Sequence, residues 1–155
     1  MRITILRTFL FLFINFVLVF YIGNILMADG SNSNWYISLN KAPWTPPGWV
    51  FGLAWSFLLI CFSIYLSLLS QKNVSNKLIL IILVQYLLNI VWNYFFFNQH
   101  LTELGLIDIS FLTLTVYYIF YTNLKTMKWK SIFIVPYLLW LLVATSLNLY
   151  IVIYN

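Results

Sequence analysis

Amide and indole side chains recur along one stretch of this chain at the spacing of a helix face. Gln85, Asn89, Trp92 and Asn93 follow an i, i+4, i+7, i+8 pattern inside an otherwise apolar run. In an apolar environment such groups must find hydrogen bonds, either to another helix or to a ligand. The pattern therefore predicts a polar stripe that turns toward the interior of a helical bundle.

Other tryptophans lie where an interfacial role explains them poorly. Trp129, between two lysines, is typical of a membrane–water boundary. Trp55 and Trp140 are not, and at 1.5 Å per residue Trp140 lies roughly 13 Å into the last apolar run. Asn148 follows it at helical spacing. We interpret these amides and indoles as a pocket for a flat, largely apolar ligand, with packing between helices as the alternative.

The usual catalytic and metal-binding groups are sparse. The chain has one histidine, His100, and one cysteine, Cys61, which leaves no multi-histidine metal site and no intrachain disulfide. The acidic residues Asp29, Glu103 and Asp108 form no pair suited to acid–base chemistry. Asp108 is expected within two turns of the external surface, where water still reaches it. The residues thus favour binding over conventional catalysis and predict no metal site and no required cofactor.

The elements that carry these residues follow from composition. Hydrophobic residues make up 63% of the 155 residues and charged residues 7%, against about 45–50% and about 25% in soluble domains. Long uncharged runs predict an all-α membrane protein, one domain over residues 1–155. Its five transmembrane helices are expected near 5–26, 49–69, 78–98, 104–124 and 131–153. The last three connections are short, so consecutive helices are expected to pack antiparallel.

The basic residues indicate orientation. Seven of the eight lie on one side of a five-helix arrangement and only Lys41 lies on the other. The positive-inside rule then predicts a cytoplasmic N-terminus and an external C-terminus. Because the basic residues are scattered between apolar runs, they form no nucleic-acid-binding stripe. The external segment 29–48 is rich in aromatic residues and prolines, and we interpret it as an ordered lid, with an aromatic anchor at the bilayer interface as the alternative.

Four motifs, taken together and in order, resemble the translocator protein family (TspO/MBR, the tryptophan-rich sensory proteins or peripheral benzodiazepine receptors). The first runs from Trp35-Tyr36 through Lys41, Pro43-Trp44 and Pro46-Pro47-Gly48-Trp49 to Trp55. The second is Leu88-Asn89-x-x-Trp92-x-x-Phe95-Phe96-Phe97, and the third is Leu106-Ile107-Asp108-Ile109. The fourth is Pro136-Tyr137-Leu138-Leu139-Trp140 followed by Ala144-Thr145 and Leu147-Asn148.

The resemblance implies a five-helix, usually homodimeric protein of the lipid bilayer, here expected in a bacterial cell membrane. Members bind porphyrins such as protoporphyrin IX or haem, and other aromatic small molecules, beneath the first loop. By position the ligand-binding set comprises Trp35, Tyr36, Pro43, Trp55, Asn89, Trp92, Trp140, Ala144 and Leu147. Some bacterial members are reported to degrade protoporphyrin IX in light, and Trp55 and Trp140 match the tryptophans assigned to that catalytic reaction. The alternative function is a transporter of porphyrins or other hydrophobic small molecules.

Two departures from the family pattern affect these expectations. Ala42 follows the loop lysine where the family usually has proline, which allows a different lid conformation. The sterol motif of animal members ends in a basic residue, but this chain continues from Tyr150 to Asn155 without one. Sterol binding through that motif is therefore not expected.

A pair of reporter fusions tests the orientation. A reporter active only outside the cytoplasm should work when fused after Asn155 and fail when inserted between the second and third helices, because the basic residues keep that turn inside. Reporter activity in membranes of expressing cells is the measurement. The reverse pattern would place the lid in the cytoplasm.

Overall fold

The computed structural model describes residues 2–72 and 74–155, and the regular structure in these ranges is helical. The first part of the chain forms α1 (Arg2–Asn15), a π-helical segment η1 (Phe16–Ile22) and α2 (Gly23–Leu26). A 3-10 turn η2 (Gly30–Asn32) and the short helix α3 (Asn34–Ser38) follow. The remaining elements are α4 (Gly48–Leu69), α5 (Asn76–Asn93), the π-helical η3 (Tyr94–Asn98), α6 (Thr102–Met127), the 3-10 segment η4 (Lys128–Phe133) and α7 (Val135–Tyr154).

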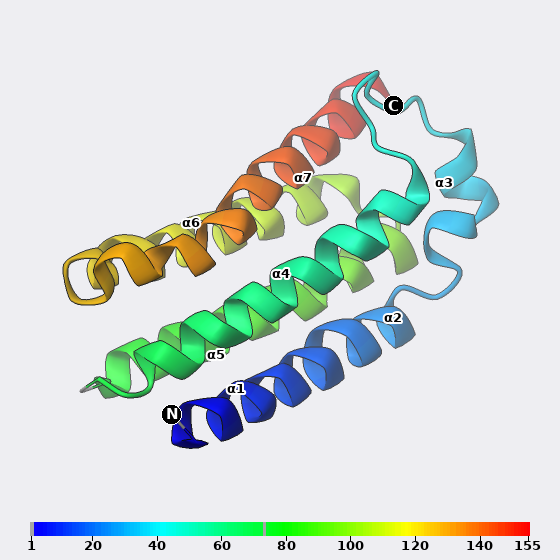
Figure 1. Ribbon diagram of the computed structural model, residues 1–155. Coiled ribbons are helices and arrows are strands. Elements are labelled where there is room, and N and C mark those ends of the chain that lie inside the picture. The colour runs from blue at the N-terminus through cyan, green and yellow to red at the C-terminus, as the bar shows by residue number, and fades with distance from the viewer. Residues whose placement is uncertain (1, 73) are drawn as a thin grey trace.

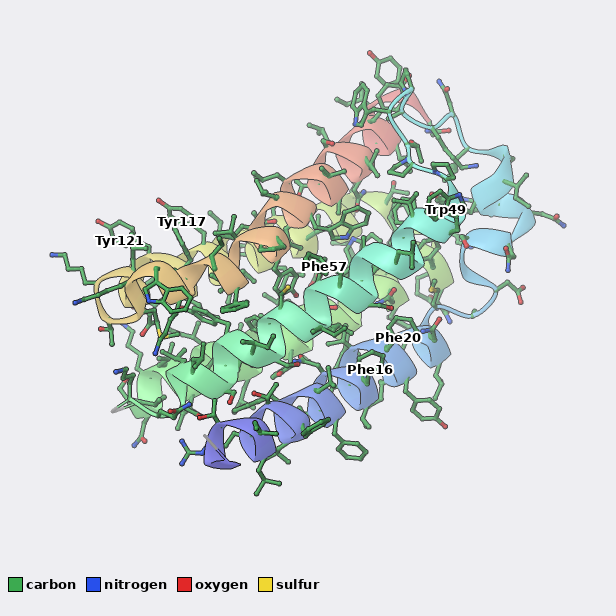
Figure 2. All side chains as sticks on the ribbon, in the orientation of Figure 1. Phe16, Phe20, Trp49, Phe57, Tyr117 and Tyr121 are labelled. Carbon is green, nitrogen blue, oxygen red and sulfur yellow. The ribbon has the colours of Figure 1, made fainter. Side chains whose placement is uncertain are left out.

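Five of the helical stretches in the described ranges are long and apolar enough to cross a membrane. They are Thr4–Asn32, Gly48–Leu69, Asn76–Asn98, Thr102–Phe133 and Val135–Tyr154. Large apolar side chains project from their outer faces, including Phe16, Phe57, Tyr117 and Tyr121 (Figure 2). An exterior of this kind is stable in lipid, so the predicted fold class, a five-helix transmembrane bundle, is confirmed.

The contacts between the five spans follow a ring. The helix α1 packs on α4, α4 on α7, α7 on α6 and α6 on α5, while η1 and α2 close the ring against α5. Two glycines allow close approach: a Cβ on Gly23 would lie 3.1 Å from Asn93 Nδ2, and one on Gly105 would lie 3.2 Å from Asn148 Oδ1. The predicted packing of consecutive helices holds for α5 with α6 and for α6 with α7. The prediction is wrong for α4 with α5, because the main neighbours of α4 are α1, η4 and α7.

The two ends of the bundle differ in charge. The start of α1, the α4–α5 turn and the α6–α7 turn share one end (Figure 1), which carries Lys72, Lys77, Lys125, Lys128 and Lys130. There the Arg7 guanidinium donates to the Ser70 carbonyl, 3.2 Å away. Lys128, the first residue of η4, has a positive φ of 52°, and this backbone conformation ends α6 at Met127.

The opposite end is covered by the segment between α2 and α4. Asn40 and Asn155 exchange two hydrogen bonds, from Asn40 N to Asn155 Oδ1 (2.8 Å) and from Asn155 Nδ2 to the Asn40 carbonyl (3.2 Å). Trp44 donates to Ser146 Oγ (3.2 Å) and meets the Tyr150 ring edge-on, 5.6 Å between centroids. The segment is therefore an ordered lid that is fastened to the end of α7.

Tyr137 of α7 fills the middle of the ring. It is 2% exposed, and its hydroxyl accepts hydrogen bonds from Asn89 and from Gln85 Nε2, the latter at 2.8 Å. Its ring meets Phe62 of α4 at 5.2 Å. One side chain of α7 thus links α4 to α5, two helices that do not pack extensively on each other.

Replacing Tyr137 with Phe should destabilise the bundle by about 1–3 kcal/mol, because the amides of Gln85 and Asn89 would lose their shared acceptor. Tyr86→Phe is the matched control, since the Tyr86 hydroxyl is buried without a partner and its removal should be neutral or stabilising. Thermal unfolding in detergent can be followed with a thiol-reactive dye that reaches the buried Cys61 on unfolding. Equal losses for both variants would contradict this role of Tyr137.

Candidate functional site

A cavity of about 490 Å³ lies in the half of the bundle beneath the lid. All five spans and the lid contribute to its wall. Eight aromatic side chains line it: Phe20, Tyr36, Phe51, Trp55, Trp92, Phe96, Phe97 and Trp140. Its size and its mainly apolar wall, rich in aromatic side chains, are typical of a site for a small organic molecule.

Seven of the nine predicted ligand-binding residues lie in the wall of this cavity: Tyr36, Trp55, Asn89, Trp92, Trp140, Ala144 and Leu147. Trp35 and Pro43 do not. The Trp35 ring stacks on His100, with 4.0 Å between centroids, and Pro43 is exposed on the lid. Neighbouring residues of the short helix α3 point about 100° apart, and of these two only Tyr36 lines the cavity, while Trp35 also packs on Phe96 of the wall.

The floor of the cavity is the polar stripe of α5. Asn89 is 3% exposed and donates its amide to Tyr137, and the Asn93 amide donates to the Asn89 carbonyl at 3.2 Å. Gln85, one turn deeper, is buried and lies outside the cavity wall. The predicted stripe therefore faces the interior, where its deep part forms contacts between helices and its upper part borders the cavity.

Trp92 and Asn148 join α5, α6 and α7 beside the cavity. The Trp92 indole donates to Asn148 Oδ1 at 3.1 Å, and Asn148 Nδ2 donates to the Thr102 carbonyl at 3.0 Å. Trp92 also stacks on Phe96, 5.1 Å between centroids. Because its N–H and one ring face are already engaged, Trp92 is a rigid part of the wall.

Trp55 and Trp140 approach the cavity from α4 and α7. Trp55 meets Tyr137 edge-on at 6.2 Å, and Trp140 meets Phe51 edge-on at 5.5 Å. The Trp140 Nε1 is buried without an acceptor. An unpaired indole N–H costs free energy, which a small rotation toward a ligand acceptor would recover.

Lys41 carries the only formal charge among the described residues that line the cavity. Its ammonium lies 4.6 Å from the centroid of the Tyr36 ring and 3.4 Å from the Ile37 carbonyl. Burial raises the pKa of Tyr36, so its phenol is neutral at physiological pH. The lid side of the cavity therefore suits a ligand with an acidic group.

Asp108 corrects an expectation. It lies near the start of α6 as predicted, but it is 6% exposed and one carboxylate oxygen is buried without a partner. Asp108 is three residues after Gly105 and therefore lies on nearly the same face of α6, the face that packs into the bundle. The expectation considered only its distance from the membrane surface, but the direction of the side chain is what removes it from water.

The first span contributes wall residues that sequence reasoning missed, among them Phe20, Asn24 and Met27. The interruption of an apolar run by Gly23-Asn24 was the available signal. Gly48, Gly52 and Ser56 form a row of small residues at every fourth position of α4, a pattern that often allows two helices to pack closely. Here a Cβ on either glycine would meet nothing within 4 Å. Among residues 2–72 and 74–155, no other helix packs closely on these two glycines, and both line the cavity.

Fold and site together define a five-helix membrane protein with an aromatic cavity under an ordered loop. Residues 11–154 match the model of the TspO/MBR family. Protein CrtK of Rhodobacter capsulatus is 35% identical over 122 residues, 74% of each chain. A tryptophan-rich sensory protein of Cereibacter sphaeroides is 32% identical over 114 residues (74% of this chain, 72% of the relative). A tryptophan-rich protein TspO of Archaeoglobus fulgidus is 32% identical over 131 residues (81% and 82%).

The chain belongs to the TspO/MBR family of integral membrane proteins. The family expected from the four sequence motifs is thereby confirmed.

Proposed function

We propose that the protein is a membrane receptor that binds a porphyrin, such as protoporphyrin IX or haem, in the cavity beneath the lid. The observation that carries this proposal is the 490 Å³ cavity lined by Trp55, Trp92 and Trp140. A sensory role is also named for the relative from Cereibacter sphaeroides.

The cavity suits a flat amphiphile. Aromatic walls favour a planar π-system through stacked and edge-on contacts. Acidic groups are costly to bury unless they are paired, and Lys41 at the lid is the cation within reach of a ligand. The porphyrin macrocycle would thus lie among the indoles, with its carboxylates pointing toward the lid.

A receptor fits the site better than a transporter or a conventional enzyme. The described wall residues include no carboxylate, histidine or cysteine that could act as a base or nucleophile. Beneath the cavity, Asn89 of the wall is hydrogen-bonded to Tyr137, whose hydroxyl also accepts from Gln85. Transport would require this network to open.

Binding can be measured by absorbance and tryptophan quenching with protoporphyrin IX and its dimethyl ester. Each should saturate near one molecule per chain. Lys41→Gln should weaken binding of the free acid about two- to fivefold and leave the ester unchanged, because only the acid pairs with the ammonium. Lys77→Gln, at the opposite end, is the matched control. Unsaturable partitioning like that into empty micelles would refute the proposal.

Illumination of the same porphyrin-loaded preparation separates a receptor from a photochemical enzyme. A bound photoexcited porphyrin generates reactive oxygen beside Trp55 and Trp140, whose electron-rich indoles are oxidisable. We expect a modest loss of the porphyrin bands in light that slows in Trp55→Phe and Trp140→Phe. Bleaching at the rate of free porphyrin, unchanged in variants that still bind, would leave binding as the sole function.

A further inference from the structure

A second cavity, of about 210 Å³, lies at the basic end of the bundle, away from the porphyrin cavity. It is a groove between the start of α5 and the last turns of α6, lined by Ser75, Lys77, Leu78, Ile81, Tyr118, Thr122 and Asn123. We call it the α5–α6 groove. Nothing in the proposed function uses it.

The α5–α6 groove offers hydrogen-bond donors that the fold leaves free. The Lys77 ammonium lies 5.5 Å from the centroid of the Tyr118 ring and is exposed. Ser75 Oγ accepts from the Leu78 N–H (3.2 Å), which leaves its own hydroxyl hydrogen free to donate. Thr122, by contrast, already donates to the Tyr118 carbonyl at 2.7 Å. A ligand here would meet the Lys77 ammonium and the hydroxyls of Ser75 and Tyr118, both of which line the groove, and such a combination binds a phosphate oxygen.

The three acidic side chains of the sequence all fall within the described ranges, and they lie away from that cation. Glu103 and Asp108 lie on α6 as well, but Asp108 is ten residues before Tyr118, about 15 Å along the helix axis. Asp29 lies beyond α2, toward the lid end. Lys125, one turn after Thr122 on the same face of α6, adds a second positive charge near the groove. The groove is therefore electropositive and has no internal counter-ion.

The position of the groove suits a lipid better than a free anion. The α5 span begins at Asn76, so Ser75 and Lys77 lie where the span meets the aqueous boundary. Leu78 and Ile81 continue the wall into the apolar zone, where Leu114 of α6 is exposed. A molecule that fills the groove would place a charged head beside Lys77 and an apolar tail against these side chains. Basic pockets between helices at a membrane surface bind phospholipid heads in this way.

We propose that the α5–α6 groove is a binding site for the phosphate head of an anionic phospholipid, held by Lys77 and the hydroxyls of Ser75 and Tyr118. The site would attach the outer side of the α5–α6 pair to one annular lipid.

The test is native mass spectrometry of the delipidated protein, titrated with phosphatidylglycerol or with phosphatidylcholine of the same acyl chains. The wild type should bind one phosphatidylglycerol in preference to phosphatidylcholine. Lys77→Gln should lower the phosphatidylglycerol affinity about fivefold and leave phosphatidylcholine unaffected. Lys130→Gln removes the same charge from the same end but outside the groove, and it should keep the preference.

Two further measurements make the outcome decisive. Tyr118→Phe, which removes only a hydroxyl, should cause a smaller loss in the same direction. Millimolar inorganic phosphate should leave the lipid bound, because it lacks the apolar tail. Equal losses in Lys77→Gln and Lys130→Gln would reduce the effect to general charge attraction and overturn the site. Absence of a lipid preference, or displacement by inorganic phosphate, would overturn it too.

Discussion

The hydrogen bonds to the Tyr137 hydroxyl are the interaction on which the rest of the structure depends. In a bundle surrounded by lipid, the amides of Gln85 and Asn89 have no water to bind, so a partner must come from another helix. Tyr137 supplies it from α7 and places its ring against Phe62 of α4. Around and below this point the helices enclose a close-packed core, which also holds the buried hydrogen bond from Asn15 Nδ2 to Ser63 Oγ (2.7 Å). Above it the spans line a cavity. The Tyr137 contact thus lies next to the cavity, since Asn89 belongs both to this network and to the cavity wall.

Periodicity and charge predicted much of this arrangement from sequence. The five spans follow from uncharged runs, and the polar stripe of α5 follows from the spacing of Gln85, Asn89 and Trp92, because a spacing of three or four residues determines which side chains share a face. The partner of that stripe could not be predicted. Tyr137 is an ordinary aromatic residue in an apolar run, and its hydroxyl gains a role only because the packing of α7 between α4 and α6 brings it to the amides of α5.

The lid was less predictable than the spans, since a loop has no repeating face. Its aromatic content indicated an ordered segment, but Trp35 and Tyr36 were both expected to face the ligand. A single turn of α3, capped by the Ser33 hydroxyl at the Tyr36 N–H (3.2 Å), directs Tyr36 inward and leaves Trp35 against His100. Ala42, which departs from the family pattern, is 4% exposed, and its carbonyl accepts from Thr45 N at 2.9 Å. The turn thus forms without proline at that position.

The contacts that fasten the lid differ in kind from those at the basic end, and this difference bears on what each end can bind. The lid is held by neutral groups: the paired amides of Asn40 and Asn155, and the indole of Trp44 on Ser146. Neutral hydrogen bonds depend little on ionic strength, so the cover of the cavity should persist over a wide range of salt. At the other end the lysines have no acidic neighbours on the adjacent helix turns, and their interactions with anions weaken as salt screens them. The bundle therefore has a cavity whose cover depends little on salt and, at the opposite end, a basic surface whose attraction for anions weakens with salt, with the Tyr137 network between them.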